Sequence, residues 1–226
     1  MNDTKSDMIS GELYQPFSKE LYNDRLYCKS LCHELNNLLP LKRDDINLIL
    51  DKLLNEWNEA FIEQPFHCTY GYNISLGKNF YSKDNLFIDD SGIVSISDNV
   101  TIGYNVTILT SVTPTSSQDR AKGLESTLPV RIYEGVCIGS NTVIYPGVKI
   151  NRESIIEPGS VVKDDIPPFV NMTEYKDSAL TFTLRVWAAT DDYETLRCSL
   201  LENMNKRFNE EGIELAYTTY DIHLSK

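Results

Sequence analysis

Apolar residues follow three different periods along the chain, and each predicts a different kind of element. Over residues 18–58, leucines and isoleucines recur at helical spacing, as in SKELYNDRLYCKSLCHELNNLL. Ser18 is suited to cap the first of two helices, and a break over residues 36–40 separates it from a second helix over residues 43–57. The aliphatic stripes on both helices are typical of packing surfaces.

The pattern changes at residue 74, and from residue 96 a six-residue repeat dominates the middle of the chain. Isoleucine opens the units ISDNVT, IGYNVT and ILTSVT, and after a loop the register resumes with IYEGVC, IGSNTV, IYPGVK, INRESI, IEPGSV and VKDDIP. An aliphatic first position followed by small or turn-forming residues predicts short strands joined by tight turns, with three strands to each triangular coil. The repeat therefore predicts a parallel β-helix, preceded by a looser stretch over residues 76–88.

A third pattern follows the repeat. Residues 181–187 alternate as a strand, residues 191–209 have an amphipathic helical pattern, and residues 213–224 read as a returning strand. The predicted fold class is thus mainly β, with an α+β tail. We expect a helical cap over residues 1–64, the β-helix over residues 65–170 and a strand-helix-strand tail over residues 171–226.

Composition narrows the classes of partner. The chain has 226 residues and a formal net charge of -12, which disfavours nonspecific binding to nucleic acid or anionic lipid. Membrane crossing by a helix needs about 20 consecutive apolar residues, and no run approaches that length. The N-terminus MNDTKSDMISGELY has no apolar signal segment, so a cytoplasmic location is expected.

The cysteines predict no metal site. Cys28 and Cys32 lie four residues apart and share a helical face, but no second pair of ligands accompanies them in the sequence. We interpret the five cysteines as free thiols that are buried or half-buried.

Three motifs together resemble the galactoside and maltose O-acetyltransferases: MISGELYQPFSKEL, QPFHCTYGYNISLGKNFY and GSVVKDDIPP. The resemblance covers about three quarters of the chain. It implies a left-handed β-helix, a homotrimer, and acetyl-CoA bound as co-substrate in a groove between coils. It further implies transfer of an acetyl group to a sugar hydroxyl, at sites built by two subunits each.

The catalytic position is where this sequence departs from the family. The polar loop VTILTSVTPTSSQDR interrupts the repeat, and loops of this kind usually carry a repeat protein's chemistry. In the resembled family a His-Pro pair supplies the general base here, whereas this chain has Thr113-Pro114. A threonine hydroxyl cannot act as a base at pH 7, so Thr113 is expected to be inactive, and Asp90 is the remaining candidate proton acceptor.

Other positions match the family in part. For the acceptor the resemblance implies Tyr81, Lys83 and Asn85, although Lys83 replaces an asparagine. For the cofactor it implies Arg120, Cys137, Gly139, Ser140, Ser160 and Lys163, with Cys137 in place of a tryptophan. Several replacements remove charge partners of both substrates.

The tail resembles the end of the cytoplasmic domain of small-conductance mechanosensitive channels, through RVWAATDDY and FNEEGIEL. The resemblance changes near residues 175–177, as in a fusion, and no pore helices accompany it. Two hypotheses stay open: an acetyltransferase impaired by the loss of its histidine, and a non-catalytic trimeric module that binds a ligand or displays its tail.

Overall fold

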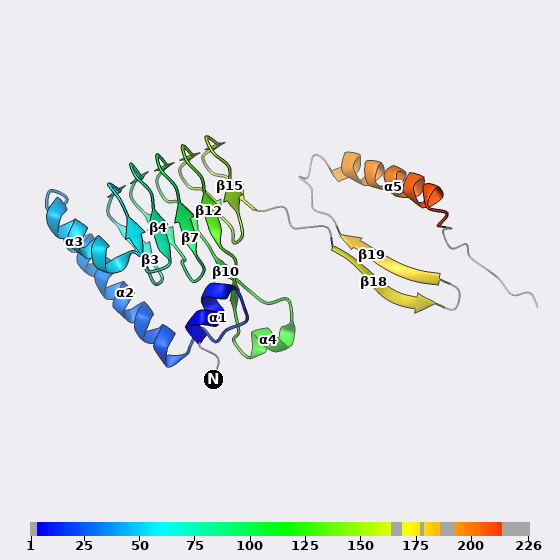
Figure 1. Cartoon of the computed structure of the whole chain (residues 1–226), viewed down its shortest axis with the longest axis horizontal. Coiled ribbons are helices and arrows are strands. Elements are labelled where there is room, and N and C mark those ends of the chain that lie inside the picture. The colour runs from blue at the N-terminus through cyan, green and yellow to red at the C-terminus, as the bar shows by residue number, and fades with distance from the viewer. Residues whose placement is uncertain (1–3, 164–168, 177–178, 186–192, 214–226) are drawn as a thin grey trace, which may run out of the picture. The chain divides into compact units, whose positions relative to one another are not determined.

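The computed structural model describes residues 4–163, 169–176, 179–185 and 193–213. Two compact units cover residues 1–164 and 165–226. The first unit is a parallel β-helix with helices against one end, as the hexapeptide period predicts (Figure 1). Among the described residues, no helix has the length and apolarity to cross a membrane.

Three parallel sheets of five strands each form the walls of the β-helix. The first sheet contains β1 (Glu56–Trp57), β4 (Ile74–Leu76), β7 (Val94–Ile96), β12 (Val130–Ile132) and β15 (Lys149–Ile150). The second sheet contains β2 (Phe61–Ile62), β5 (Tyr81–Ser82), β8 (Thr101–Ile102), β13 (Cys137–Ile138) and β16 (Ile155–Ile156). The third sheet contains β3 (Phe66–Cys68), β6 (Leu86–Ile88), β9 (Thr107–Ile108), β14 (Val143–Ile144) and β17 (Val161–Val162).

The position of a residue within the six-residue unit predicts whether its side chain is buried. The isoleucines that open the units point inward and are buried, as at Ile102, Ile108 and Ile138. Side chains one residue earlier point outward, because successive residues of a strand alternate between its faces. Turns between strands often hold asparagine in the left-handed conformation, and these asparagines stack: Asn105 donates to Asn141 over 3.1 Å.

Two corners of the triangular coil matter for function. The loop corner connects the third sheet to the first and comprises residues 89–93, 109–129 and 145–148. It includes β10 (Ser111–Val112), α4 (Ser117–Ala121) and β11 (Ser126–Thr127), with β10 and β11 paired antiparallel. The turn corner connects the second sheet to the third and comprises residues 83–85, 103–106, 139–142 and 157–160.

Three helices precede the coils: α1 (Thr4–Ser10), α2 (Lys19–Asn37) and α3 (Arg43–Leu53). The Ser18 side chain accepts a hydrogen bond from the Leu21 amide, so the predicted cap is confirmed. Helix α3 ends at Leu53, four residues before the predicted end at residue 57. The reason is that Glu56 and Trp57 already pair with β4 as the first strand. The β-helix thus starts before residue 65, and α1 was not predicted.

The second unit contains β18 (Phe169–Lys176), β19 (Ala179–Arg185) and α5 (Tyr193–Glu210). The strand and helix predicted for the tail correspond to β19 and α5. The antiparallel partner β18 was not predicted, and it begins before the expected domain boundary at residue 171. The returning strand expected over residues 213–224 lies outside the described residues, apart from Ile213.

Candidate active site

Thr113 lies on the loop corner, directly after β10, with an exposed side chain. The β10–β11 register pairs Ser111 with Thr127 and Val112 with Ser126, so the next opposed position to Thr113 is Glu125. Glu125 is half-buried, and hydrogen bonds with Tyr14 of the N-terminal segment fix its position. Its backbone exchanges hydrogen bonds of 2.9 and 3.1 Å with Tyr14, whose hydroxyl donates to the Glu125 carboxylate over 3.2 Å. The hairpin register therefore puts Glu125 opposite Thr113.

Arg120 organises the same loop from α4. Its Nη1 donates to the carbonyl oxygens of Pro114 and Thr115, at 2.9 and 2.6 Å. These bonds fix the backbone that follows Thr113. Gln15 adds a second tether, since its Nε2 donates to the Lys122 carbonyl over 3.1 Å. Within the structure Arg120 thus positions the loop, whereas the sequence implied a role in cofactor binding.

Asp90 is wholly buried beneath the loop corner. Its Oδ1 accepts from the amides of Thr69 and Tyr70 at 3.0 and 2.8 Å, and its Oδ2 accepts from the Asn73 amide at 3.3 Å. Burial raises the pKa of Asp90 to about 6, against the opposing effect of these hydrogen bonds. A proton acceptor must come within hydrogen-bond reach of the substrate hydroxyl, and Asp90 is 0% exposed.

The three acceptor candidates follow one another on the second sheet and the turn corner. Tyr81 projects outward from β5 and hydrogen-bonds the Glu63 carboxylate, which raises the pKa of Tyr81 to about 12. The Lys83 ammonium lies 4.4 Å from the centre of the Tyr104 ring. Asn85 is exposed and adopts a left-handed turn conformation, with φ of 62°.

Most cofactor candidates lie on this same side. Cys137 is exposed on β13, and Gly139, Ser140 and Ser160 belong to the turn corner. The Ser140 hydroxyl accepts from the Tyr104 amide at 3.0 Å, and the Ser160 hydroxyl donates to the Glu157 carbonyl at 2.6 Å. Lys163 is different. It follows β17 on the way to the loop corner, with its ammonium 4.8 Å from the centre of the Tyr145 ring.

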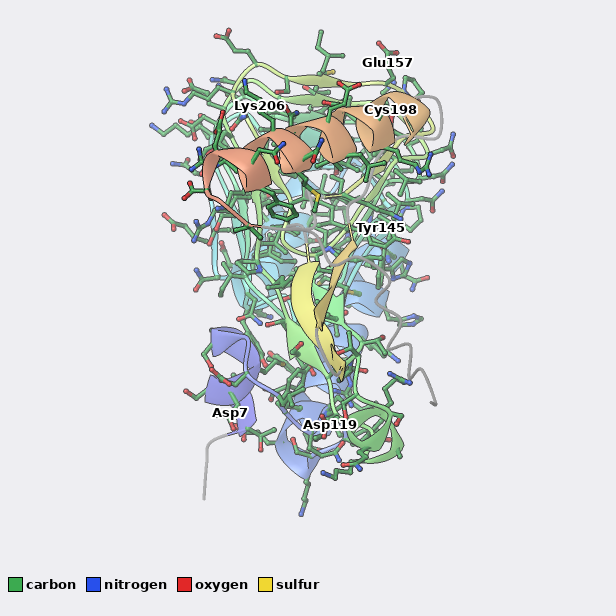
Figure 2. All side chains as sticks on the ribbon, turned by 90° about the vertical axis from the view of Figure 1, so that its right-hand side faces the viewer. Asp7, Asp119, Tyr145, Glu157, Cys198 and Lys206 are labelled. Carbon is green, nitrogen blue, oxygen red and sulfur yellow. The ribbon has the colours of Figure 1, made fainter. Side chains whose placement is uncertain are left out.

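The structure thus divides the predicted site residues between two edges. Thr113, Asp90 and Arg120 lie at the loop corner, whereas Tyr81, Lys83 and Gly139 lie beyond the third sheet. Figure 2 shows the separation, with Asp119 of α4 at the lower edge and Glu157 of the turn corner at the upper edge. One chain does not bring the two groups together.

The third sheet, which separates the two groups, has three apolar residues among its five outward positions. Its outward positions are His67, Phe87, Thr107, Val143 and Val161. The first sheet is polar at the equivalent positions, with Glu56, Ser75, Ser95, Arg131 and Lys149. Exposed apolar surface of this kind often marks a protein interface.

Neither described histidine lies at the loop corner. His33 lies on α2, within 3.4 Å of the Asn37 amide, and His67 projects from β3 as an exposed strand residue. His223 is outside the described residues. Glu125 and Tyr14 are the residues that the sequence reasoning missed at this site. They come together only through pairing between segments 111 residues apart, which no local pattern reveals.

The stacked triangular coils and the loop corner define a β-helical protein of the hexapeptide-repeat class. Comparisons with known proteins identify its family. The model of the maltose acetyltransferase hexapeptide capping motif matches residues 7–57, and that of the bacterial transferase hexapeptide (six repeats) matches residues 129–164. "Putative acetyltransferase YJL218W" of Saccharomyces cerevisiae is 41% identical over 163 residues, which are 71% of this chain and 83% of that protein. The chain belongs to the hexapeptide-repeat acetyltransferase family.

Solved structures of two acetyltransferases have the same fold as this chain. A maltose O-acetyltransferase from Clostridium difficile 630 is 33% identical, with a TM-score of 0.70 over 82% of this chain and 98% of that one. A galactoside acetyltransferase in complex with coenzyme A is 31% identical, with a TM-score of 0.68 over 86% of this chain and 94% of that one. The C-terminal family model of the mechanosensitive ion channel MscS matches residues 149–215. That match begins within the last coils, earlier than the predicted change near residues 175–177.

Proposed function

We propose that this chain is an acetyl-CoA-dependent O-acetyltransferase for a sugar hydroxyl, and that Thr113 impairs its turnover. The observation that carries the proposal is the loop corner: the β10–β11 hairpin, its Arg120 bonds and Glu125 are all in place around a residue that cannot take a proton. Two family relatives of solved structure act on maltose and galactoside by their names, which supports a sugar acceptor.

The chemistry explains why one residue matters so much. A sugar hydroxyl is a poor nucleophile until a base removes its proton during attack on the thioester carbonyl. Losing a general base typically costs a factor of about 10² to 10⁴, or about 3 to 5 kcal/mol of barrier. Glu125 cannot make up this loss in full, since its carboxylate already accepts the Tyr14 hydroxyl. We assign Asp90 a structural role, as an acceptor for the turn that follows β3.

We further propose a homotrimer in which neighbouring chains meet at the outer face of the third sheet. Assembly would let the loop corner of one chain complete a site with residues from another chain, such as Tyr81. The division of the site residues between two edges of one chain supports this arrangement. A monomer would leave every site incomplete.

The residues at hand fit acetyl-CoA in part. Coenzyme A is a polyanion, and Lys163 and Arg120 are the cations among its six candidate partners. Arg120 is already engaged with the carbonyls of Pro114 and Thr115. Ser140, Ser160 and exposed Cys137 offer polar contacts along the coils. Bound acetyl-CoA would supply the acetyl group as a thioester, while the chain would orient it and exclude water.

A non-catalytic trimeric binding module is the second candidate. Two residues that the resemblance implies in substrate binding have structural roles in this chain, which favours the second candidate. Arg120 holds the loop, and an added Cβ at Gly139 would lie 2.7 Å from the Pro158 Cα, so that glycine serves coil stacking. In this case the coils would be retained for assembly or display.

Acetyl-CoA consumption by the purified chain, with galactosides and maltose as acceptors, tests the proposal. Slow but acceptor-dependent consumption is expected. A melting temperature measured with and without millimolar CoA runs beside it, because a ligand at 100 times its Kd adds about 2.7 kcal/mol of stability. If the chain consumes no acetyl-CoA and its melting temperature does not shift with CoA, the non-catalytic alternative is supported.

A further inference from the structure

Three buried thiols meet between the cap and the β-helix. Cys28 and Cys32 face inward from α2, and Cys68 ends β3. The Cys68 sulfur lies 3.5 Å from that of Cys28 and 3.8 Å from that of Cys32, and all three sulfurs lie within 4.8 Å of one another. Their residues are 1%, 3% and 6% exposed. We call this group the thiol trio.

The fold fixes the trio's geometry. Helix α2 lies beside β3 (Figure 1). Cys28 and Cys32 are one helical turn apart, so their sulfurs share the face that meets Cys68. Asn36, one turn further, clamps helix to strand: its Nδ2 donates to the Phe66 carbonyl and its Oδ1 accepts from the Phe66 amide, both over 2.9 Å. The trio is therefore a built arrangement and not a chance approach of mobile side chains.

The spacing of the sulfurs suits a single ion with three sulfur ligands. Sulfurs bound to one ion at about 2.3 Å each lie roughly 3.4 to 4.0 Å apart, from a pyramidal to a planar trigonal arrangement. The two separations of 3.5 and 3.8 Å that Cys68 makes lie within this range. Across the part of the chain that the structure describes, no fourth cysteine, histidine or carboxylate joins the group. A structural zinc site, which needs four ligands, is thus disfavoured.

Charge favours a trivalent ion. Three thiolates with a monovalent or divalent ion would leave net negative charge in the apolar core, which is unfavourable. Three thiolates with a trivalent ion are neutral.

We propose that Cys28, Cys32 and Cys68 form a binding site for a soft, three-coordinate trivalent ion, with trivalent arsenic as its probe. Arsenous acid carries three hydroxyl groups on arsenic. Each thiol displaces one of them, so three As–S bonds form, three As–O bonds and three S–H bonds break, and three waters leave. No oxidation is involved, and no net charge enters the core.

Reduced full-length protein incubated with arsenite provides the test. We expect one arsenic per chain, loss of three of the five reactive thiols in a thiol assay under denaturing conditions, and three sulfur neighbours by X-ray absorption at the arsenic edge. A higher melting temperature would accompany binding. Fewer than three sulfurs per arsenic, or the absence of stoichiometric binding, would overturn the proposal.

Two controls locate the site. The double variant Cys137→Ser, Cys198→Ser removes the exposed thiols and is expected to bind arsenite as the wild type does. Cys32→Ala is expected to lower the sulfur count to two and weaken binding at least tenfold. If Cys32→Ala fails to fold, the double variant and the wild-type sulfur count still decide the matter. Zinc binding one-to-one more tightly than arsenite would contradict the three-coordinate assignment.

Discussion

Thr113 and Glu125 occupy opposed positions at the loop end of the β10–β11 hairpin, one step beyond the paired Val112 and Ser126. In catalytic sites that use histidine as a base, a carboxylate commonly accepts the second ring N–H and fixes the tautomer. Under the proposed function, Thr113 stands where the resembled family has its histidine, and Glu125 would be the carboxylate that orients such a ring.

Glu125 should become important once a histidine is restored. In a Thr113→His background, Glu125→Gln is expected to lower kcat/KM for acetyl transfer about 10²-fold, because the imidazole loses its orienting carboxylate. The assay is acetyl-CoA consumption at a saturating sugar concentration. Equal melting temperatures of the two variants would exclude a folding defect. Unchanged kcat/KM would show that Glu125 does not reach the ring.

Gly139 and Gly159 should respond differently to alanine. An alanine Cβ at Gly139 would lie 2.7 Å from the Pro158 Cα, so Gly139→Ala is expected to cost about 2 kcal/mol through overpacking of the stacked turns. Gly159 has open space around it but φ of 78°, so Gly159→Ala is expected to cost only about 1 kcal/mol. Urea denaturation measures both. The reverse order would mean that stacking does not explain Gly139.

Asp90 should make the stability depend on pH. Its pKa is raised from 3.8 to about 6, so the folded chain takes up a proton near pH 6 that the unfolded chain takes up only near pH 4. Stability from this group therefore increases as the pH falls through 6. Relative to Asp90→Asn, the wild type should gain about 1 kcal/mol in free energy of unfolding between pH 7.5 and pH 5. A difference that is constant with pH would refute the raised pKa.

Assembly should depend on the outer face of the third sheet. Val143→Glu places a charge in the middle of that face and is expected to shift the mass found by light scattering from trimer to monomer. Ser95→Glu makes the matched change on the polar first sheet and should leave the mass unaltered. A monomeric wild type, or a trimeric Val143→Glu variant, would disprove the proposed interface.

The repeat made the coils predictable. An inward isoleucine every six residues fixes both the strands and the core, so positions such as Ile102 and Ile138 follow from the sequence alone. The coil starts earlier than predicted, because Glu56 and Phe61 lie in units without the regular period. Pairing with β4 and β5 makes them strands, and the local pattern does not show this.

The site was harder to predict, because it depends on contacts between distant segments. Thr113 was identified through the resemblance to the family's His-Pro pair, but its neighbour Glu125 depends on hairpin register. Cys68 could not be assigned to Cys28 and Cys32, since its partners lie 40 and 36 residues away. The separation of Tyr81 from Thr113 likewise depends on which corner of the triangle each residue reaches.

The most direct test compares acetyl-CoA consumption by the wild type and by Thr113→His, with Thr113→Val as a control, on the same panel of galactosides and maltose. An intact scaffold that lacks only its base predicts a gain of about 10² to 10⁴ in rate for Thr113→His and none for Thr113→Val. Wild-type turnover equal to that of Thr113→His would show that another base serves the site, and would contradict the assignment of Thr113 as the defect.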